Sequence, residues 1–251
     1  MATTELGLIE SAKRAAAHLA VDRFVASDMV VGIGSGSTVV YAVERLIELA
    51  RSGQLSGVRC VPTSFQAVQL VQAGAGHLTL TDLNAHPSVD VTIDGADEVD
   101  EALNLIKGGG ACMFQEKLVA YNSATLVIVA DYRKRARSLG TAWKKGVPVE
   151  VSPLAHASVS RHIASLTGGQ PKLRMATEKC GPVVTDNGNF VLDVVYPEAS
   201  LVATALPSLN AQLLGIPGVI ETGLFINLAA HVIYGEADGC VELINRSPTT
   251  S

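Results

Sequence analysis

A run of glycines and hydroxyl residues near the N-terminus could bind an anion. It reads VGIGSGST from Val31 to Thr38 and precedes a segment with helical spacing of apolar residues. Glycines let a ligand approach the backbone closely, and a helix that starts here directs free N–H groups into the loop. Ser35, Ser37 and Thr38 add hydroxyl donors. The pattern favours a phosphate site, and the alternative is an ordinary strand-to-helix turn.

An acidic turn follows a second apolar run, Val89–Ile93. It begins with Asp94-Gly-Ala-Asp97 and continues with further acids. Ligands of parallel sheets bind beyond the carboxyl ends of the strands, so these carboxylates are expected where chemistry takes place. The alternative, a solvated acidic turn, applies mainly to Glu98–Glu101. The spacing does not match a calcium loop.

Three consecutive glycines form the third segment, in the stretch KGGGACMFQEK from Lys107 to Lys117. Such a run does not belong inside a helix or strand, and its N–H groups could hold ligand oxygens. Lys107 could stabilise negative charge at the edge of this loop. Glu116 opens the apolar helix that follows, where a carboxylate also favours the helix dipole without any catalytic role.

Nucleotide sites are disfavoured by the same residues. The dinucleotide fingerprint requires a third glycine where this chain has Ser37, and the next strand lacks the acidic residue that would hold a ribose. A Walker loop ends in Gly-Lys-Ser or Gly-Lys-Thr, and this glycine run contains no lysine.

Strands and helices alternate around these segments, which predicts a parallel sheet covered on both faces. Apolar spacing predicts helices over Leu8–Ala20, Val39–Ala50 and Ser64–Ala73, and strands over Met29–Ile33, Val58–Val61, Val89–Ile93 and Leu126–Val129. The pattern changes after Gly140. The sequence after Gly140 predicts a strand Val147–Val151, a helix Pro153–Leu166 and a hairpin Val183–Val195 that turns at Asn187-Gly188. It then predicts a helix Leu201–Leu214, with Pro207 as an irregularity, and short strands from Gly218 to Ile244.

Two domains are therefore expected. A catalytic domain comprises residues 1–140 and 215–251, and a small α+β subdomain comprises residues 141–214.

Composition narrows the class of protein. The 251 residues are 48% hydrophobic and 17% charged with a net charge of −5, so a packed core is expected and nucleic acid is a poor partner. The four cysteines form no Cys-x-x-Cys pair and the six histidines show no ligand spacing, which disfavours a metal and fits free thiols in a reducing compartment. No signal peptide or membrane span is recognised, so we expect a cytoplasmic protein.

Taken together, the three segments resemble type A ribose-5-phosphate isomerases. The signatures are Gly34-Ser-Gly-Ser-Thr38, Asp94-Gly-Ala-Asp97-Glu98, Lys107-Gly-Gly-Gly110 and Glu116-Lys117, supported by Gly146-Val-Pro-Val-Glu150, Val184-Thr-Asp-Asn-Gly-Asn189 and Ile216-Pro-Gly-Val219. They follow the family's order from about Lys13 to Gly239. The resemblance implies a Rossmann-like α/β domain with a small α+β, ferredoxin-like lid. It also implies a homodimer or homotetramer that interconverts ribose 5-phosphate and ribulose 5-phosphate in the pentose phosphate pathway.

The resemblance also implies roles for individual residues. Glu116 matches the general base, and Asp94 and Lys107 match its partners at the sugar oxygens. The implied substrate-binding positions are Lys13, Ser35, Gly36, Ser37, Thr38, Asp94, Gly95, Ala96, Asp97, Lys107, Gly108, Gly109, Gly110 and Lys134.

The chemistry is coherent without the resemblance. Moving a carbonyl between C1 and C2 needs a base and donors for the charge of an enediolate, which a carboxylate, a lysine and glycine N–H groups supply. No step requires a metal or an organic cofactor. Two other functions stay open: an acyl transferase with Glu116 as nucleophile, and a non-catalytic sugar-phosphate sensor. Neither a coenzyme A site nor a DNA-binding module is recognised in the sequence.

Overall fold

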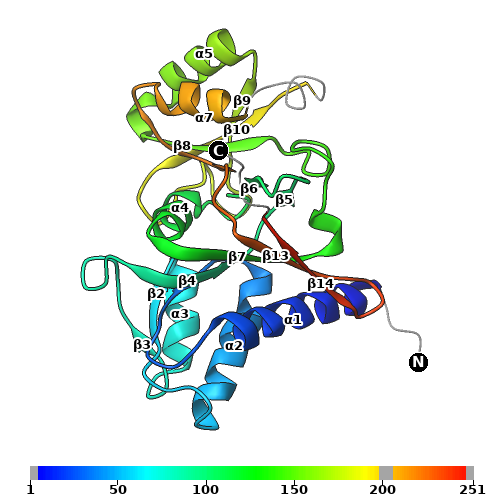
Figure 1. Ribbon diagram of the computed structural model, residues 1–251. Coiled ribbons are helices and arrows are strands. Elements are labelled where there is room, and N and C mark those ends of the chain that lie inside the picture. Colours follow the sequence, from blue (N-terminus) through cyan, green and yellow to red (C-terminus); the bar gives the residue numbers. More distant parts are fainter. Residues whose placement is uncertain (1–4, 198–205, 247–251) are drawn as a thin grey trace, which may run out of the picture. The chain divides into compact units, whose positions relative to one another are not determined.

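The computed structural model describes residues 5–197 and 206–246, which form two compact units (Figure 1). The first unit contains the residues up to Ala96, Gln115–Arg133 and those from Leu228 onwards. The second contains Asp97–Phe114 and Lys134–Asn227. These divisions do not coincide with the expected domain boundaries near residues 140 and 215, which stay a prediction.

A seven-stranded sheet forms the centre of the first unit, in the order β14-β13-β7-β4-β1-β2-β3. Neighbouring strands are parallel except for the antiparallel pair β13 and β14. The strands are β1 (Val30–Ile33), β2 (Arg59–Pro62), β3 (Thr79–Leu80), β4 (Val89–Asp94), β7 (Ser123–Asp131), β13 (His231–Gly235) and β14 (Val241–Asn245). The predicted parallel sheet is confirmed, and the C-terminal strands join it.

Helices cover both faces of this sheet. They are α1 (Glu5–Phe24), α2 (Ser37–Arg51) and α3 (Phe65–Ala73), which apolar spacing predicted, and α4 (Met113–Tyr121), the apolar helix expected to start at Glu116. Val31 and Ile33 of β1 are buried with residues of α1, α2 and α3, whereas Val30 of the same strand is buried with Val119 of α4. Alternate residues of a strand face opposite sides, so these two clusters lie on opposite faces.

The second unit is built on an antiparallel sheet with the order β11-β8-β10-β9. Its strands are β8 (Val147–Val151), β9 (Gln170–Leu173), β10 (Phe190–Val195) and β11 (Val219–Thr222), and its helices are α5 (His156–Thr167) and α7 (Leu206–Leu214). Alternate valines of β8 are fully buried in one cluster with the apolar faces of α5 and α7. A three-stranded sheet in the order β12-β6-β5 consists of β5 (Glu98–Val99), β6 (Leu105–Ile106) and β12 (Leu224–Phe225). Short 3₁₀ turns occupy Tyr132–Lys134 (η1) and Pro153–Ala155 (η2).

The predicted hairpin at Asn187-Gly188 is wrong in its first arm. The turn forms, because Gly188 N–H donates to Thr185 O and Thr185 N–H donates to Asn189 O, both at 2.9 Å. Residues 183–186 form no strand, however, and β10 pairs with β8 and β9 instead. The Thr185 side chain donates to the buried carboxylate of Glu150 at 2.8 Å, so this segment is anchored by side-chain bonds rather than by a ladder. Residues 201–205 of the predicted helix Leu201–Leu214 lie outside the described residues, and its remainder, residues 206–214, coincides with α7.

The described part of the chain lacks two kinds of feature. No helix there is long and apolar enough to cross a membrane. Residues 5–197 and 206–246 contain no group of three or more His, Cys, Asp or Glu side chains arranged to hold a metal ion.

Candidate active site

The glycine and hydroxyl run connects β1 directly to the start of α2. Gly36 is the N-cap of α2, with a φ of 104°, a conformation that glycine adopts without strain. Gly36 and Ser37 are exposed to solvent. Because a glycine has no side chain with which to cap the helix, the first N–H groups of α2 can donate hydrogen bonds to a bound anion.

Lys13 of α1 reaches this helix start. Its Nζ donates to Ser37 Oγ at 3.1 Å and to Glu10 Oε1 at 2.8 Å. The hydrogen bond from Lys13, followed by one from Tyr41, lowers the pKa of Glu10. The structure thus brings Lys13 and Ser37 together and places a positive charge beside the α2 N-terminus.

A cluster of hydroxyls supports the same loop from β2 and α3. Ser35 Oγ bonds to Ser64 Oγ at 2.6 Å and to Thr63 Oγ1 at 2.9 Å, and both partners are buried. Gly36 N–H donates to Gln66 Oε1 at 2.8 Å. Sequence reasoning missed these three residues. The available signal was Thr63-Ser64 at the carboxyl end of a predicted strand, where Ser64 caps α3.

Asp94 ends β4 and is fully buried. Its Oδ1 accepts the N–H of Ser35 at 3.1 Å and that of Gly95 at 2.7 Å. β1 and β4 are adjacent parallel strands, so their carboxyl ends meet at one edge of the sheet. The Asp94 carboxylate therefore joins the glycine and hydroxyl run to the acidic turn.

Gly34 is required for that approach, which yields a stability prediction. A Cβ on Gly34 would overlap Asp94 Oδ1 and lie 2.6 Å from Asp94 Cα, whereas a Cβ on Gly95 would meet nothing closer than 3.6 Å. We expect Gly34→Ala to lower the free energy of unfolding by about 1–3 kcal/mol, as overpacking typically does. Gly95→Ala is the matched control, and urea unfolding measures both. Equal stability of the two variants would contradict the close approach.

In the second unit, Asp97 holds the glycine loop. Its N–H donates to Ile106 O at 2.9 Å, and its Oδ2 accepts the N–H of Gly109 at 2.6 Å. Gly108 has a φ of 98°, and its carbonyl accepts the N–H of Ala111 at 3.0 Å, so residues 108–111 form a tight turn. A Cβ on Gly108 would lie 2.6 Å from Met113 Cε, and one on Gly109 would overlap the carboxylate of Asp97.

Lys107, which precedes this turn, is held in place through its backbone. Its N–H donates to Gly223 O at 2.9 Å, and only 2% of the residue is exposed. Its ammonium lies 5.4 Å from the ring centroid of Phe225 in β12. The ring face attracts the ammonium and helps to hold it, and burial in a low dielectric strengthens the effect of a cation on a nearby oxyanion.

Glu98 is not part of a solvated turn, so that alternative is wrong for this residue. It is fully buried, and its two oxygens accept the N–H groups of Gly140, Ala142 and Trp143. Asp100 is also buried, and its carboxylate accepts hydrogen bonds from the backbone N–H and from the side-chain amide of Asn104. Glu98 thus organises the loop at 140–143.

Two further predicted residues lie in separate elements. Glu116 is in the first turn of α4 and is 4% exposed. Lys134 ends η1, with its ammonium 5.8 Å from the ring centroid of Trp143. The first unit contains Lys13, Ser35–Thr38, Asp94–Ala96 and Glu116, and the second contains Asp97, Lys107–Gly110 and Lys134.

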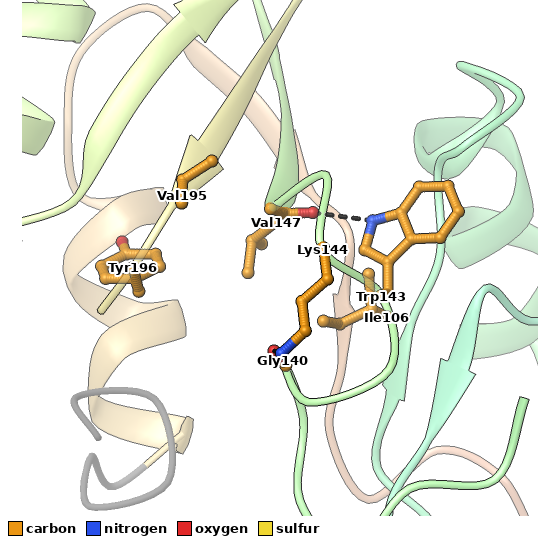
Figure 2. A pocket seen from close by; sticks show the side chains of 8 residues that line it. Ile106, Gly140, Trp143, Lys144, Val147, Val195 and Tyr196 are labelled. Carbon is orange, nitrogen blue, oxygen red and sulfur yellow. Dashed lines mark hydrogen bonds between the residues drawn. The ribbon is translucent and has the colours of Figure 1, made fainter. Parts of the chain in front are cut away.

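A cavity of about 190 Å³ lies in the second unit (Figure 2). Figure 2 shows Val195 and Tyr196 on one side and Trp143 and Lys144 on the other, with the ring N–H of Trp143 donating to Gly146 O at 2.9 Å. None of the residues predicted for the site lines this cavity, so we do not assign it to the reaction.

Comparisons with known proteins identify the family. Residues 59–239 match the family model of ribose 5-phosphate isomerase A (phosphoriboisomerase A). The chain is 48% identical over 243 residues to a ribose-5-phosphate isomerase of Sus scrofa, covering 96% of this chain and 77% of the pig protein. It is 51% identical over 233 residues to that of Dictyostelium discoideum, covering 92% and 96%.

Solved structures agree with the sequence matches. A D-ribose-5-phosphate isomerase in complex with phospho-erythronic acid superposes with a TM-score of 0.88 at 38% identity, covering 95% of this chain and 99% of that chain. Ribose 5-phosphate isomerase A of Methanocaldococcus jannaschii gives a TM-score of 0.85 at 35% identity, covering 96% and 100%. These neighbours support the Rossmann-like α/β assignment. The match covers well over half of the chain in both kinds of comparison, and the chain therefore belongs to the ribose 5-phosphate isomerase A family.

Proposed function

We propose that this chain interconverts D-ribose 5-phosphate and D-ribulose 5-phosphate through an enediol(ate) intermediate, a step of the pentose phosphate pathway. The observation that carries the proposal is the match, at about half identity over nearly the whole chain, to proteins named ribose-5-phosphate isomerase. The residues matched by the family model include Asp94, Lys107 and Glu116.

Substrate binding is assigned to the loop between β1 and α2. The N–H groups at the start of α2, the hydroxyls of Ser35, Ser37 and Thr38, and the ammonium of Lys13 supply donors and positive charge for the phosphate. Lys134 and the residues Gly95 to Asp97 complete the proposed binding positions. Asp94 is assigned to ring opening, which needs acid–base help at the ring oxygen and O1.

Proton transfer is assigned to Glu116. In the open-chain aldose its carboxylate takes the proton from C2, the electron pair forms the C1–C2 double bond, and O1 gains negative charge. Return of the proton to C1, with transfer of the proton of the O2 hydroxyl to O1, gives the ketose. Lys107 and the N–H groups of Gly108 to Gly110 are assigned to the charge on the enediolate oxygens.

The ligand of the solved relative supports this scheme. Phospho-erythronic acid carries a phosphate and a planar carboxylate on a short hydroxylated chain. A planar carboxylate with two oxygens resembles an enediolate, and such mimics bind more tightly than substrates. The remaining proposals are a cytoplasmic location, a homodimer or homotetramer, and a reaction without a metal or organic cofactor.

Turnover under chelation tests the proposed function. Purified protein incubated with ribose 5-phosphate and excess EDTA should form ribulose 5-phosphate, measured as the ketose. Activity that EDTA abolishes and a divalent cation restores would indicate a metal-assisted hydride shift instead. Binding of ribose 5-phosphate without any ketose would favour a sensor, and hydroxylamine-sensitive acylation of Glu116 would favour a transferase.

A further inference from the structure

An arginine outside the sequence motifs holds the glycine turn that follows Lys107. Arg174 lies directly after β9, and its side chain is only 15% exposed. Its Nη1 donates to the carbonyl oxygens of Gly108 and Gly109, at 2.9 and 3.1 Å. One nitrogen of the guanidinium thus holds two successive peptide groups.

Asp193 of β10 fixes the other side of the same guanidinium. Arg174 Nε donates to Asp193 Oδ2 at 2.8 Å, and Nη2 donates to Oδ1. A two-point pair of this kind sets the plane of the guanidinium as well as its position. Asp193 is itself fixed by backbone pairing, because it lies opposite Pro148 of β8 and Lys172 of β9 in the sheet. The arginine is therefore anchored on the rigid part of the second unit.

The direction of the two carbonyls determines where the neighbouring N–H groups point. In a trans peptide the C=O and N–H bonds are antiparallel, so both N–H groups are directed away from Arg174. The N–H of Gly109, which shares a peptide with the Gly108 carbonyl, donates to Asp97 Oδ2 at 2.6 Å. The N–H of Gly110 shares a peptide with the Gly109 carbonyl and is directed away from Arg174 in the same manner.

Three glycines would not keep this arrangement unaided. Glycine has the largest backbone freedom of any residue, and Gly110 is exposed to solvent. Besides the bonds from Arg174, the turn is closed by the Ala111 N–H to Gly108 O bond and by the contact with Asp97. Arg174 adds the bond to the Gly109 carbonyl, and with it the orientation of the Gly109–Gly110 peptide.

We propose that Arg174 is a positioning residue for the isomerisation, acting through the Gly108–Gly110 turn. Held by Asp193, it keeps the N–H of Gly110 oriented for the negative charge that develops on the enediolate, while the N–H of Gly109 is held by Asp97. Oriented donors stabilise such charge without reorganisation during the reaction, and a displacement of about 1 Å can reduce the rate on the order of 10²-fold. The inference rests on the proposed function, because it concerns the same reaction.

The test compares Arg174→Gln with Arg161→Gln, an exposed arginine of α5 that serves as the matched control. We expect Arg174→Gln to lower kcat about 10–100-fold with KM changed less than about threefold, because the donors act mainly on the transition state. The affinity for phospho-erythronic acid should fall in parallel with kcat. The control should match the wild type in all three quantities. If Arg174 had a purely structural role, Arg174→Gln would lower the fraction of active protein. The protein that stays folded would then bind phospho-erythronic acid as tightly as the wild type does.

Two further variants keep the test decisive if Arg174→Gln unfolds. Arg174→Lys keeps the charge but cannot span Asp193 and both carbonyls, and we expect a kcat lowered about tenfold. Guanidinium ion added to Arg174→Ala should partly restore kcat. Wild-type kcat in a folded Arg174→Gln or Arg174→Lys would overturn the positioning role. A wild type that forms no ketose would instead defeat the proposed function, so the two failures are distinguishable.

Discussion

Glutamine in place of Glu116 is expected to leave a folded protein that binds the substrate and barely turns it over. The substitution keeps the shape of a side chain that is 4% exposed in the first turn of α4, and it removes the base. General-base catalysis is typically worth about 10²–10⁴-fold, or roughly 3–5 kcal/mol of barrier. We therefore expect kcat to fall by about 10²–10⁴-fold. Steady-state kinetics measures the fall in kcat, and calorimetric titration with ribose 5-phosphate measures whether the variant still binds the substrate.

Glu101→Gln is the control for this variant. Glu101 is exposed, so removal of its charge changes the net charge by the same amount without touching a buried carboxylate. We expect it to keep the wild-type kcat and KM. If Glu116→Gln retained more than about a tenth of the wild-type kcat, another residue would be the base, and Asp94 would be the next to test.

Removal of the Lys107 ammonium is expected to have the second-largest effect. Lys107→Ala should lower kcat on the order of 10²-fold or more, the usual effect of losing one donor to a developing oxyanion. KM should change little, because the charge that Lys107 meets develops mainly in the transition state. Since the backbone N–H to Gly223 O bond is kept, the strand pairing next to the turn should survive. Kinetics on protein with an unchanged circular dichroism spectrum gives the measurement.

Lys172→Ala of β9 is the matched control for Lys107→Ala, because Lys172 is an exposed lysine of the same unit. Its kinetics should equal those of the wild type. A Lys107→Ala variant with normal kcat and a raised KM would restrict Lys107 to ground-state binding of the phosphate.

The sequence predicted the elements whose signal is local. Apolar periodicity alone placed α1, α2 and α3 and the strands β1, β4 and β8, because burial on one face or both faces repeats along the chain within each element. The same patterns put the Ser35 loop and Asp94 at the carboxyl ends of neighbouring strands. Their hydrogen bond at 3.1 Å follows from that placement.

Sequence patterns did not predict the features that depend on residues far apart in the chain. Glu98 stands in a run of acids that resembles a solvated turn, and its partners are N–H groups more than 40 residues away, at 140–143. The first arm of the expected hairpin is anchored by Glu150, which is 35 residues from Thr185. Arg174 lies 65 residues from Gly109. Local propensity carries no information on such pairings, because strand register and buried polar bonds are set by tertiary packing.

Hydrogen exchange with solvent during turnover tests the central claim most directly. Wild-type protein is incubated with ribose 5-phosphate and EDTA in heavy water, and proton NMR follows C1 of the ribulose 5-phosphate that forms. A carboxylate proton can escape before its return, so the account predicts deuterium at C1 in at least part of the product, and loss of this exchange in Glu116→Gln in parallel with turnover. Ketose formed with complete retention of hydrogen, or exchange that persists at the wild-type rate in Glu116→Gln, would contradict a proton shuttled by Glu116.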